Sequence, residues 1–149
     1  MALVFNLFKK LQADGSLDLL TDTIKVMLVG STFTANADMD YVNPSAYQTE
    51  LGGTGYAGGY GGSGRKTLAS KVVVEDDTND RAEFSAAPVT WTAINAGTAA
   101  ACVIIRERAL TGDTMSELIA YIDSGGFPVV TNGGDLTISW SSEGILQLT

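Results

Sequence analysis

A glycine-rich segment over residues 52–64 contains the patterns that come closest to a chemical function. Within it, Gly53-Thr54-Gly55-Tyr56-Ala57-Gly58 has the spacing of the dinucleotide-binding fingerprint, in which amides at a helix N-terminus hold a pyrophosphate. The segment continues into Arg65-Lys66-Thr67, which is close to a phosphate-binding P-loop but has Arg where that loop needs Lys. Both motifs require a helix after the glycines, and residues 68–75 have the β-branched composition of a strand. The context therefore argues against a nucleotide site.

Residue types for other catalysis are scarce. The chain has no histidine, so it lacks the commonest general base and metal ligand. It has only one cysteine. Cys102 lies within the apolar run 99–105, so it reads as a buried small hydrophobe, and it cannot form an intrachain disulfide. The acidic stretch 75–80 lacks the EF-hand pattern and is typical of a solvated hairpin turn. We predict a non-enzymatic protein without cofactor or metal.

The composition and charge of the chain limit the classes of partner that we expect. In 149 residues there are 9 Lys and Arg against 17 Asp and Glu, which gives a net charge of −8. Binding to nucleic-acid phosphates needs clustered basic residues, and here they are scattered, so we expect neither a nucleic-acid nor a membrane partner. No apolar run is long enough to span a bilayer. The length suits one domain over residues 1–149.

The first segment, residues 1–13, predicts an amphipathic helix. Leu3, Leu7 and Leu11 recur every four residues, Phe8 lies beside them, and Asp14-Gly15 provides a stop. This apolar stripe has two interpretations that the sequence leaves open. It packs on the domain's own sheet, or it docks on a neighbouring subunit, in which case these four residues are partner contacts.

After Gly15 the apolar period changes to two, which predicts strands. A hairpin is expected over residues 71–85, and a central strand over 99–105 ends in Arg106-Glu107-Arg108, which should reach solvent. A second hairpin is expected from 136–140 and 145–148. The pattern favours an all-β fold with one short N-terminal helix, mainly an antiparallel sandwich or barrel of the jelly-roll or immunoglobulin-like kind.

The glycine-rich loop itself also has two open interpretations. Eight of the thirteen residues in 52–64 are glycine, so ordering the loop costs much backbone entropy. It stays mobile, or it becomes ordered by lying across a partner, with Tyr56 and Tyr60 as anchors.

The order of these motifs resembles a family of small virion proteins of tailed bacteriophages, the head-decoration or cement proteins. The resemblance spans nearly the whole chain, although each motif alone is ordinary strand or turn chemistry. It implies a β fold, a place on the virion and no enzyme activity, and it carries over no ligand residue. The matching segments are Asp14-Gly15, 17–20, 22–29, Gly53-Thr54-Gly55-Tyr56, Val89-Thr90-Trp91, 118–123, 136–140 and Gly144-Ile145-Leu146.

The resemblance implies a capsid decoration protein that binds the major capsid protein lattice on the capsid exterior, as a homo-oligomer (dimer or trimer), and that resides in the host cytoplasm during assembly. Two alternatives remain. One is a tail, neck or receptor-contacting virion protein on a similar β body. The other is a small-ligand β domain, for example for sugars, that uses Trp91, Trp140 or the loop tyrosines, although both tryptophans alternate as core residues do.

Overall fold

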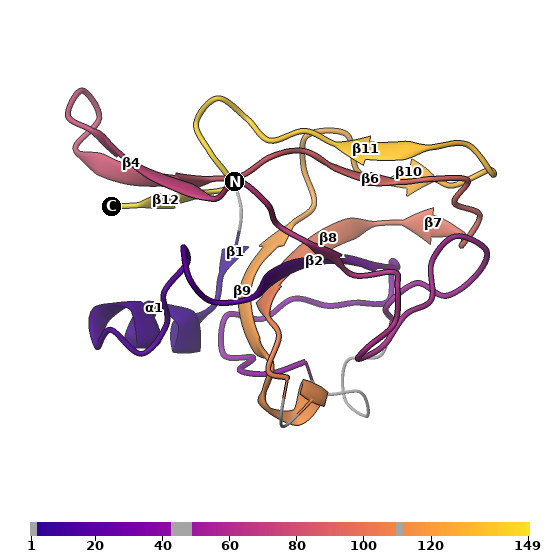
Figure 1. The fold of residues 1–149 in the computed structure, drawn as a ribbon, viewed down its shortest axis with the longest axis horizontal. Coiled ribbons are helices and arrows are strands. Elements are labelled where there is room, and N and C mark those ends of the chain that lie inside the picture. The colour runs from indigo at the N-terminus through magenta and orange to yellow at the C-terminus, as the bar shows by residue number, and fades with distance from the viewer. Residues whose placement is uncertain (1–2, 43–48, 110–111) are drawn as a thin grey trace.

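The fold is built mostly of antiparallel strands with one short α-helix, as predicted (Figure 1). The computed structural model describes residues 3–42, 49–109 and 112–149. The largest sheet has five strands in the order β1-β9-β8-β2-β3. Its strands are β1 (Leu3–Val4), β9 (Glu117–Ile122), β8 (Ala101–Arg106), β2 (Ile24–Val29) and β3 (Lys66–Thr67).

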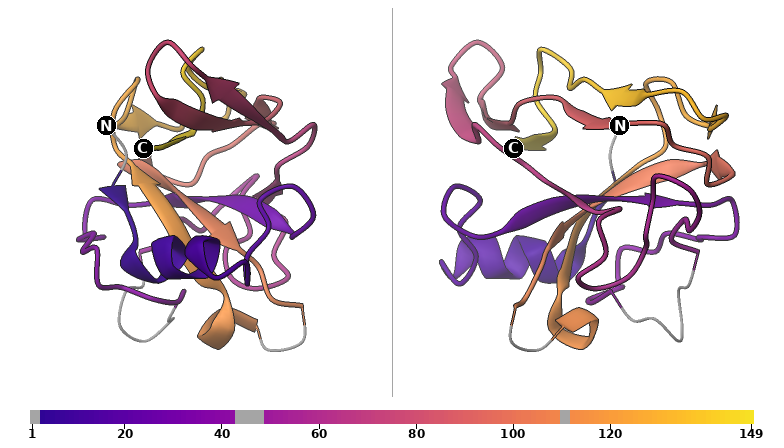
Figure 2. Two further views of the ribbon diagram at one scale, coloured as in Figure 1. Left: turned by 90° about the vertical axis from the view of Figure 1, so that its left-hand side faces the viewer. Right: turned by 45° about the vertical axis from the view of Figure 1, so that its right-hand side comes forward.

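Both faces of this sheet are covered. Every residue of β8 is buried, as the apolar run 99–105 predicted for a central strand. Alternate side chains point to opposite faces, so Cys102 and Ile104 join one apolar cluster while Val103 and Ile105 join a second. The smaller sheets are stacked over one face of the large sheet (Figure 2). The first cluster contains residues of both layers, such as Ile104 from β8 and Trp91 from the smaller sheets.

Three smaller sheets form that second layer. Their strands are β6 (Val89–Trp91) with β11 (Leu136–Ile138), β7 (Thr98–Ala99) with β10 (Val129–Val130), and β12 (Leu146–Leu148), β5 (Arg81–Ser85) and β4 (Val72–Asp76) in that order. The predicted hairpin over 71–85 is confirmed, because β4 pairs with β5 in antiparallel register. Its acidic turn is closed by the Asp76 carboxylate, which accepts hydrogen bonds from Thr78 and Asn79.

The predicted C-terminal hairpin is wrong. β11 pairs with β6 and β12 pairs with β5, so the chain crosses from one small sheet to another between them. Two contacts fix this crossing: Trp140 Nε1 donates to the Ala87 carbonyl at 3.0 Å, and the Ile145 amide donates to the Phe84 carbonyl at 2.7 Å. Leu146 thereby lies opposite Phe84, which is fully buried. Pairing with β11 would not bring Leu146 to this residue.

The N-terminal helix is shorter than predicted. α1 spans Asn6–Ala13, and Leu3–Val4 form β1, which pairs with β9. The Phe5 amide donates to the Ile119 carbonyl and so extends this pairing up to the helix. The predicted stop is confirmed: Asp14 caps the helix, and Gly15 has a φ of 71°, a conformation that glycine adopts without strain. A short 3-10 helix, η1 (Gly112–Met115), precedes β9.

Candidate functional site

The glycine-rich loop is anchored to the chain's own core at Tyr56 and Gly64, whereas most of its other residues are exposed. Tyr56 is buried, and its hydroxyl accepts from the Leu28 amide at 2.9 Å and donates to Glu50 at 3.0 Å. Trp91 packs against Tyr56 and donates from Nε1 to the Gly64 carbonyl at 2.5 Å. A Cβ added at Gly64 would lie 2.5 Å from the Tyr56 ring, so glycine is needed there for close packing. Tyr56 therefore offers no surface to a partner, and that prediction is wrong.

The two loop tyrosines make a matched pair for mutation. Tyr56→Phe should lower the free energy of unfolding by about 1–3 kcal/mol, because the buried Leu28 amide loses its acceptor. Tyr60 is 45% exposed and donates to the Ala109 carbonyl, so Tyr60→Phe should change stability by less than about 0.5 kcal/mol. Urea unfolding followed by tryptophan fluorescence measures both. Equal effects would contradict the placement of Tyr56.

Arg65, the residue at the P-loop-like position, is buried among carboxylates. Its guanidinium meets Glu50 through Nε at 3.0 Å and Nη2 at 2.7 Å, and Asp113 through Nη1 at 2.6 Å and Nη2 at 3.0 Å. Nη1 also donates to Glu107 at 3.5 Å. These contacts use all five N–H donors of a guanidinium, so Arg65 has none left for a phosphate. Its role is to tie the glycine-rich loop to η1 and to the end of β8.

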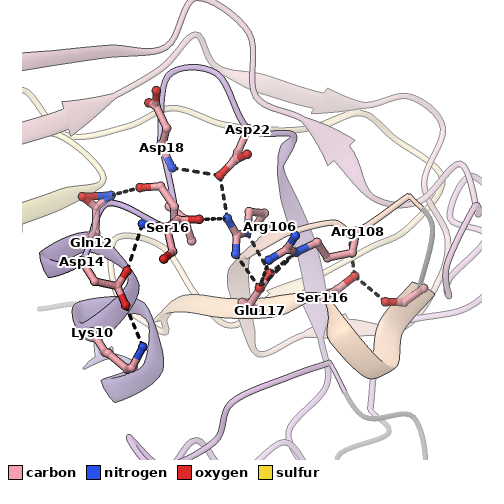
Figure 3. A network of polar contacts seen from close by, with 12 residues as sticks. Lys10, Gln12, Asp14, Ser16, Asp18, Asp22, Arg106, Arg108, Ser116 and Glu117 are labelled. Carbon is pink, nitrogen blue, oxygen red and sulfur yellow. Dashed lines mark hydrogen bonds and ion pairs between the residues drawn. The ribbon is translucent and has the colours of Figure 1, made fainter.

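A second buried arginine, Arg106 at the end of β8, joins residues 16–22 to β9 (Figure 3). Arg106 donates to Glu117 from Nε at 2.9 Å and from Nη2 at 2.5 Å, and Nη1 donates to the Ser16 carbonyl at 2.7 Å and to Asp22 at 2.9 Å. Arg108 reaches Glu117 from the solvent side at 2.8 Å. The expectation that the Arg106–Arg108 run reaches solvent is therefore wrong for Arg106, which is buried by its pairing with Glu117.

Glu117 makes the free energy of unfolding depend on pH in the acidic range. Burial alone would raise its pKa, but hydrogen bonds from Arg106 and Arg108 outweigh burial and hold the pKa below its usual value of 4.5. A carboxyl with a lowered folded pKa stabilises the protein fully above the unfolded pKa, and this stabilisation is lost as pH falls through the folded pKa.

We expect the urea midpoint of the wild type to decline as the pH falls below 4.5, and Glu117→Gln to lower the midpoint at pH 7 and to decline less steeply in acid. Urea titrations from pH 7 to pH 3 on both proteins measure this. Parallel profiles would show that Glu117 does not contribute.

The other predicted partner contacts are spread over three segments. Phe8 is fully buried in the first apolar cluster, so it is not available to a partner, and that prediction is also wrong. Leu11 packs against the same cluster, and Leu3, in β1, packs against the second one. Leu7 is half-buried and Tyr60 is exposed. The helix thus serves the chain's own core, the first of its two interpretations.

The surface that sequence reasoning missed is strand β4. Val72, Val73 and Val74 are 47%, 42% and 54% exposed, and β4 is the last strand of its sheet order. Its hairpin projects at one end of the molecule (Figures 1 and 2). Three successive β-branched residues were a strand signal, but no local pattern distinguishes an exposed edge strand from a buried one. Consecutive exposed apolar residues on an edge strand are a site for pairing with another chain.

A groove of about 860 Å³ borders the C-terminal strand on the other side of that sheet. Trp140, half-buried, contributes to its wall, as do Phe127 and apolar side chains of β11 and β12. Trp91 lies outside it, in the core. The polar groups in the lining are dispersed among Lys9, Ser124, Thr137, Ser139, Ser141, Glu143, Gln147 and Thr149.

Within the described part of the chain, no group of three or more His, Cys, Asp or Glu side chains is placed to hold a metal ion. The same residues include no helix long and apolar enough to cross a membrane. No protein-family model, no curated protein and no solved structure matches the chain.

Proposed function

We propose that this chain is a non-enzymatic structural protein that acts by binding other proteins, and specifically a capsid decoration protein of a tailed bacteriophage. The observation that carries the protein-binding role is the row of exposed valines on edge strand β4. The placement on a capsid rests on the resemblance of the sequence motifs to head-decoration proteins. The major capsid protein lattice is the proposed partner.

The interior of the chain supports such a role. Arg65 and Arg106 each join segments that are far apart in the sequence, and each is held by two or more carboxylates. A body cross-linked in this way loses little conformational freedom when it binds. A rigid protein that binds only the assembled lattice stabilises that lattice by mass action, without any chemical step.

Copy number separates the decoration role from a tail, neck or receptor-contacting role. Quantitative mass spectrometry of purified particles of the phage that encodes the chain provides the test. A decoration protein is present in amounts comparable to the major capsid protein. A handful of copies per particle would place the chain in the tail or neck, and its absence from particles would overturn both roles.

The groove beside β12 favours one second candidate, a small-ligand β domain. A half-buried tryptophan in a groove is a stacking surface for a sugar ring, and Trp140 occupies such a position. A thermal shift screen against mono- and oligosaccharides tests this role, with Trp140→Ala as the matched variant. A shift that Trp140→Ala abolishes would support it, and a flat response of the wild type would exclude sugars in the panel.

A further inference from the structure

Among the residues that the structure describes, no strand pairs with the outer edge of β4, and the sequence of this strand is complementary to itself. β5 pairs with one side of β4, and β4 ends the sheet order β12-β5-β4. The exposed valines are flanked by opposite charges, Lys71 before them and Glu75 after them. A free strand edge is satisfied by antiparallel pairing with a second strand, and two copies of one strand can supply each other.

Symmetry limits how two copies of β4 can pair. Two antiparallel strands of one sheet are related by a two-fold axis perpendicular to that sheet, so the axis keeps each side chain on its own face. Residues that lie opposite each other must also share a face. The pairing must therefore be centred on a residue, because centring it between two residues would place opposite faces together.

Centring on Val73 matches the three valines and the charged residues that flank them. Val73 then faces Val73 of the second copy, Val72 faces Val74, and Lys71 faces Glu75. Apolar residues thus meet apolar residues, and each of the two ends forms a Lys–Glu pair. The Lys71 amino group already donates to the Asp22 carbonyl, and an ammonium group has two further donors for Glu75.

The neighbouring registers match poorly. Centring on Val72 places Lys71 against Val73 and Ser70 against Val74. Centring on Val74 places Val73 against Glu75 and Val72 against Asp76, whose carboxylate is already bound by Arg81. The Val74 register also brings Lys71 to Asp77, but Asp77 lies in the turn beyond β4, and this register sets two valines against carboxylates. Hydrophobicity and charge together therefore favour the Val73 register.

We propose that the chain forms a homodimer by antiparallel pairing of β4 with β4 of a second copy, centred on Val73, which joins two three-stranded sheets into one. The occupant of this edge is a second copy because the strand's own charges complement it. The inference rests on the same strand edge as the proposed protein-binding role and specifies a second copy as its occupant. The oligomeric state in solution tests the dimer, whereas copy number on particles tests capsid binding, so the two can fail separately.

The dimer should be weak. A single pair of strands buries less area than the roughly 1,200–2,000 Å² of stable protein interfaces, so association in dilute solution depends on concentration. Copies held side by side on a lattice would experience a high effective concentration, which favours the same contact.

Cysteine cross-linking tests the register. Val73 is the one position whose side chain faces its own copy, so Val73→Cys should form a disulfide-linked dimer under mild oxidation. Val74→Cys is more exposed, but the two copies of residue 74 are offset by about 7 Å along the strands, which prevents a bridge. The native Cys102 is buried, and burial raises the pKa of its thiol to about 12, so it stays unreactive.

Val130→Cys, at an exposed valine of β10, measures random collision. We expect Val73→Cys to cross-link at least about ten-fold faster than Val74→Cys and Val130→Cys. Equal rates for the three variants would overturn the proposal, and faster cross-linking of Val74→Cys would overturn the register.

Charge reversal tests the reversible dimer without a new covalent bond. Glu75→Lys replaces two attractive pairs with two repulsive ones, so the dissociation constant measured by sedimentation equilibrium should rise at least about ten-fold. Adding Lys71→Glu restores opposite charges and should recover the dimer. Asp123→Lys, an exposed change of the same charge outside β4, should have no such effect.

A wild type that stays monomeric at millimolar concentration, or a dimer insensitive to Glu75→Lys, would overturn the proposal. Growth into larger assemblies would also contradict it, because a two-fold pairing closes at the dimer.

Discussion

Arg65→Leu should lower the free energy of unfolding by about 3–5 kcal/mol, because it leaves the partly buried carboxylates of Glu50 and Asp113 without their shared cation. The loss of stability should be largest in the segments that Arg65 joins, which are the glycine-rich loop and η1. Urea unfolding at pH 7, followed by circular dichroism, measures the change. Hydrogen exchange should show faster opening of loop amides, such as that of Gly59, which donates to Glu50.

Arg108→Leu is the matched control for this change. Arg108 also binds a buried carboxylate, but its side chain is 46% exposed and Glu117 keeps Arg106. We expect a loss below about 1 kcal/mol. If Arg65→Leu were as mild as Arg108→Leu, the buried cluster would not be what holds the glycine-rich loop in place.

Trp91→Ala should also lower the free energy of unfolding by about 3–5 kcal/mol, through a cavity in the core between the two layers. Trp91 is fully buried and binds the Gly64 carbonyl, so the substitution removes packing and a hydrogen bond together. Trp91→Phe separates these, because it keeps much of the packing and should cost about 1–3 kcal/mol for the unpaired carbonyl.

Trp140→Ala is the control for burial, because Trp140 also donates to a backbone carbonyl, that of Ala87, but is only half-buried at the wall of the groove. This substitution should lower the free energy of unfolding by roughly 1–2 kcal/mol. Thermal and urea unfolding of the three variants test the ranking. A milder effect for Trp91→Ala than for Trp140→Ala would contradict the placement of Trp91 in the core.

Local patterns were sufficient for most of the strands. The β4–β5 hairpin and the buried strand β8 followed from period, β-branched composition and turn residues, because these signals arise within a few neighbouring residues. The helix stop at Asp14-Gly15 was also local. The extent of α1 was not, since residues 3 and 4 are drawn into the sheet by β9, more than a hundred positions away in the sequence.

The errors share one physical origin, which is pairing between distant segments. Arg106 follows a strand end, where charge normally reaches water, but Glu117 on the adjacent strand buries it. The glycine-rich loop had the composition of a mobile segment, yet Tyr56, Arg65 and Trp91 fix it through contacts with other elements. The exposed edge of β4 depends on which strand lies at the end of a sheet, and composition does not determine that order.

The proposed role therefore rests on a different surface from the one that the sequence indicated. Helix α1 and Tyr56 serve the interior, whereas β4 and the groove beside β12 remain open at the surface. A decoration protein needs contacts with the lattice and between its own copies, and two separate surfaces would allow both. The β4 pairing accounts for the second kind of contact.

Cryo-electron microscopy of the intact particle would show whether this chain covers a capsid. A decoration role requires density for this β domain at regular positions over the capsid exterior, with each copy in contact with the major capsid protein. Capsids without that density, or density confined to the tail or neck, would contradict it.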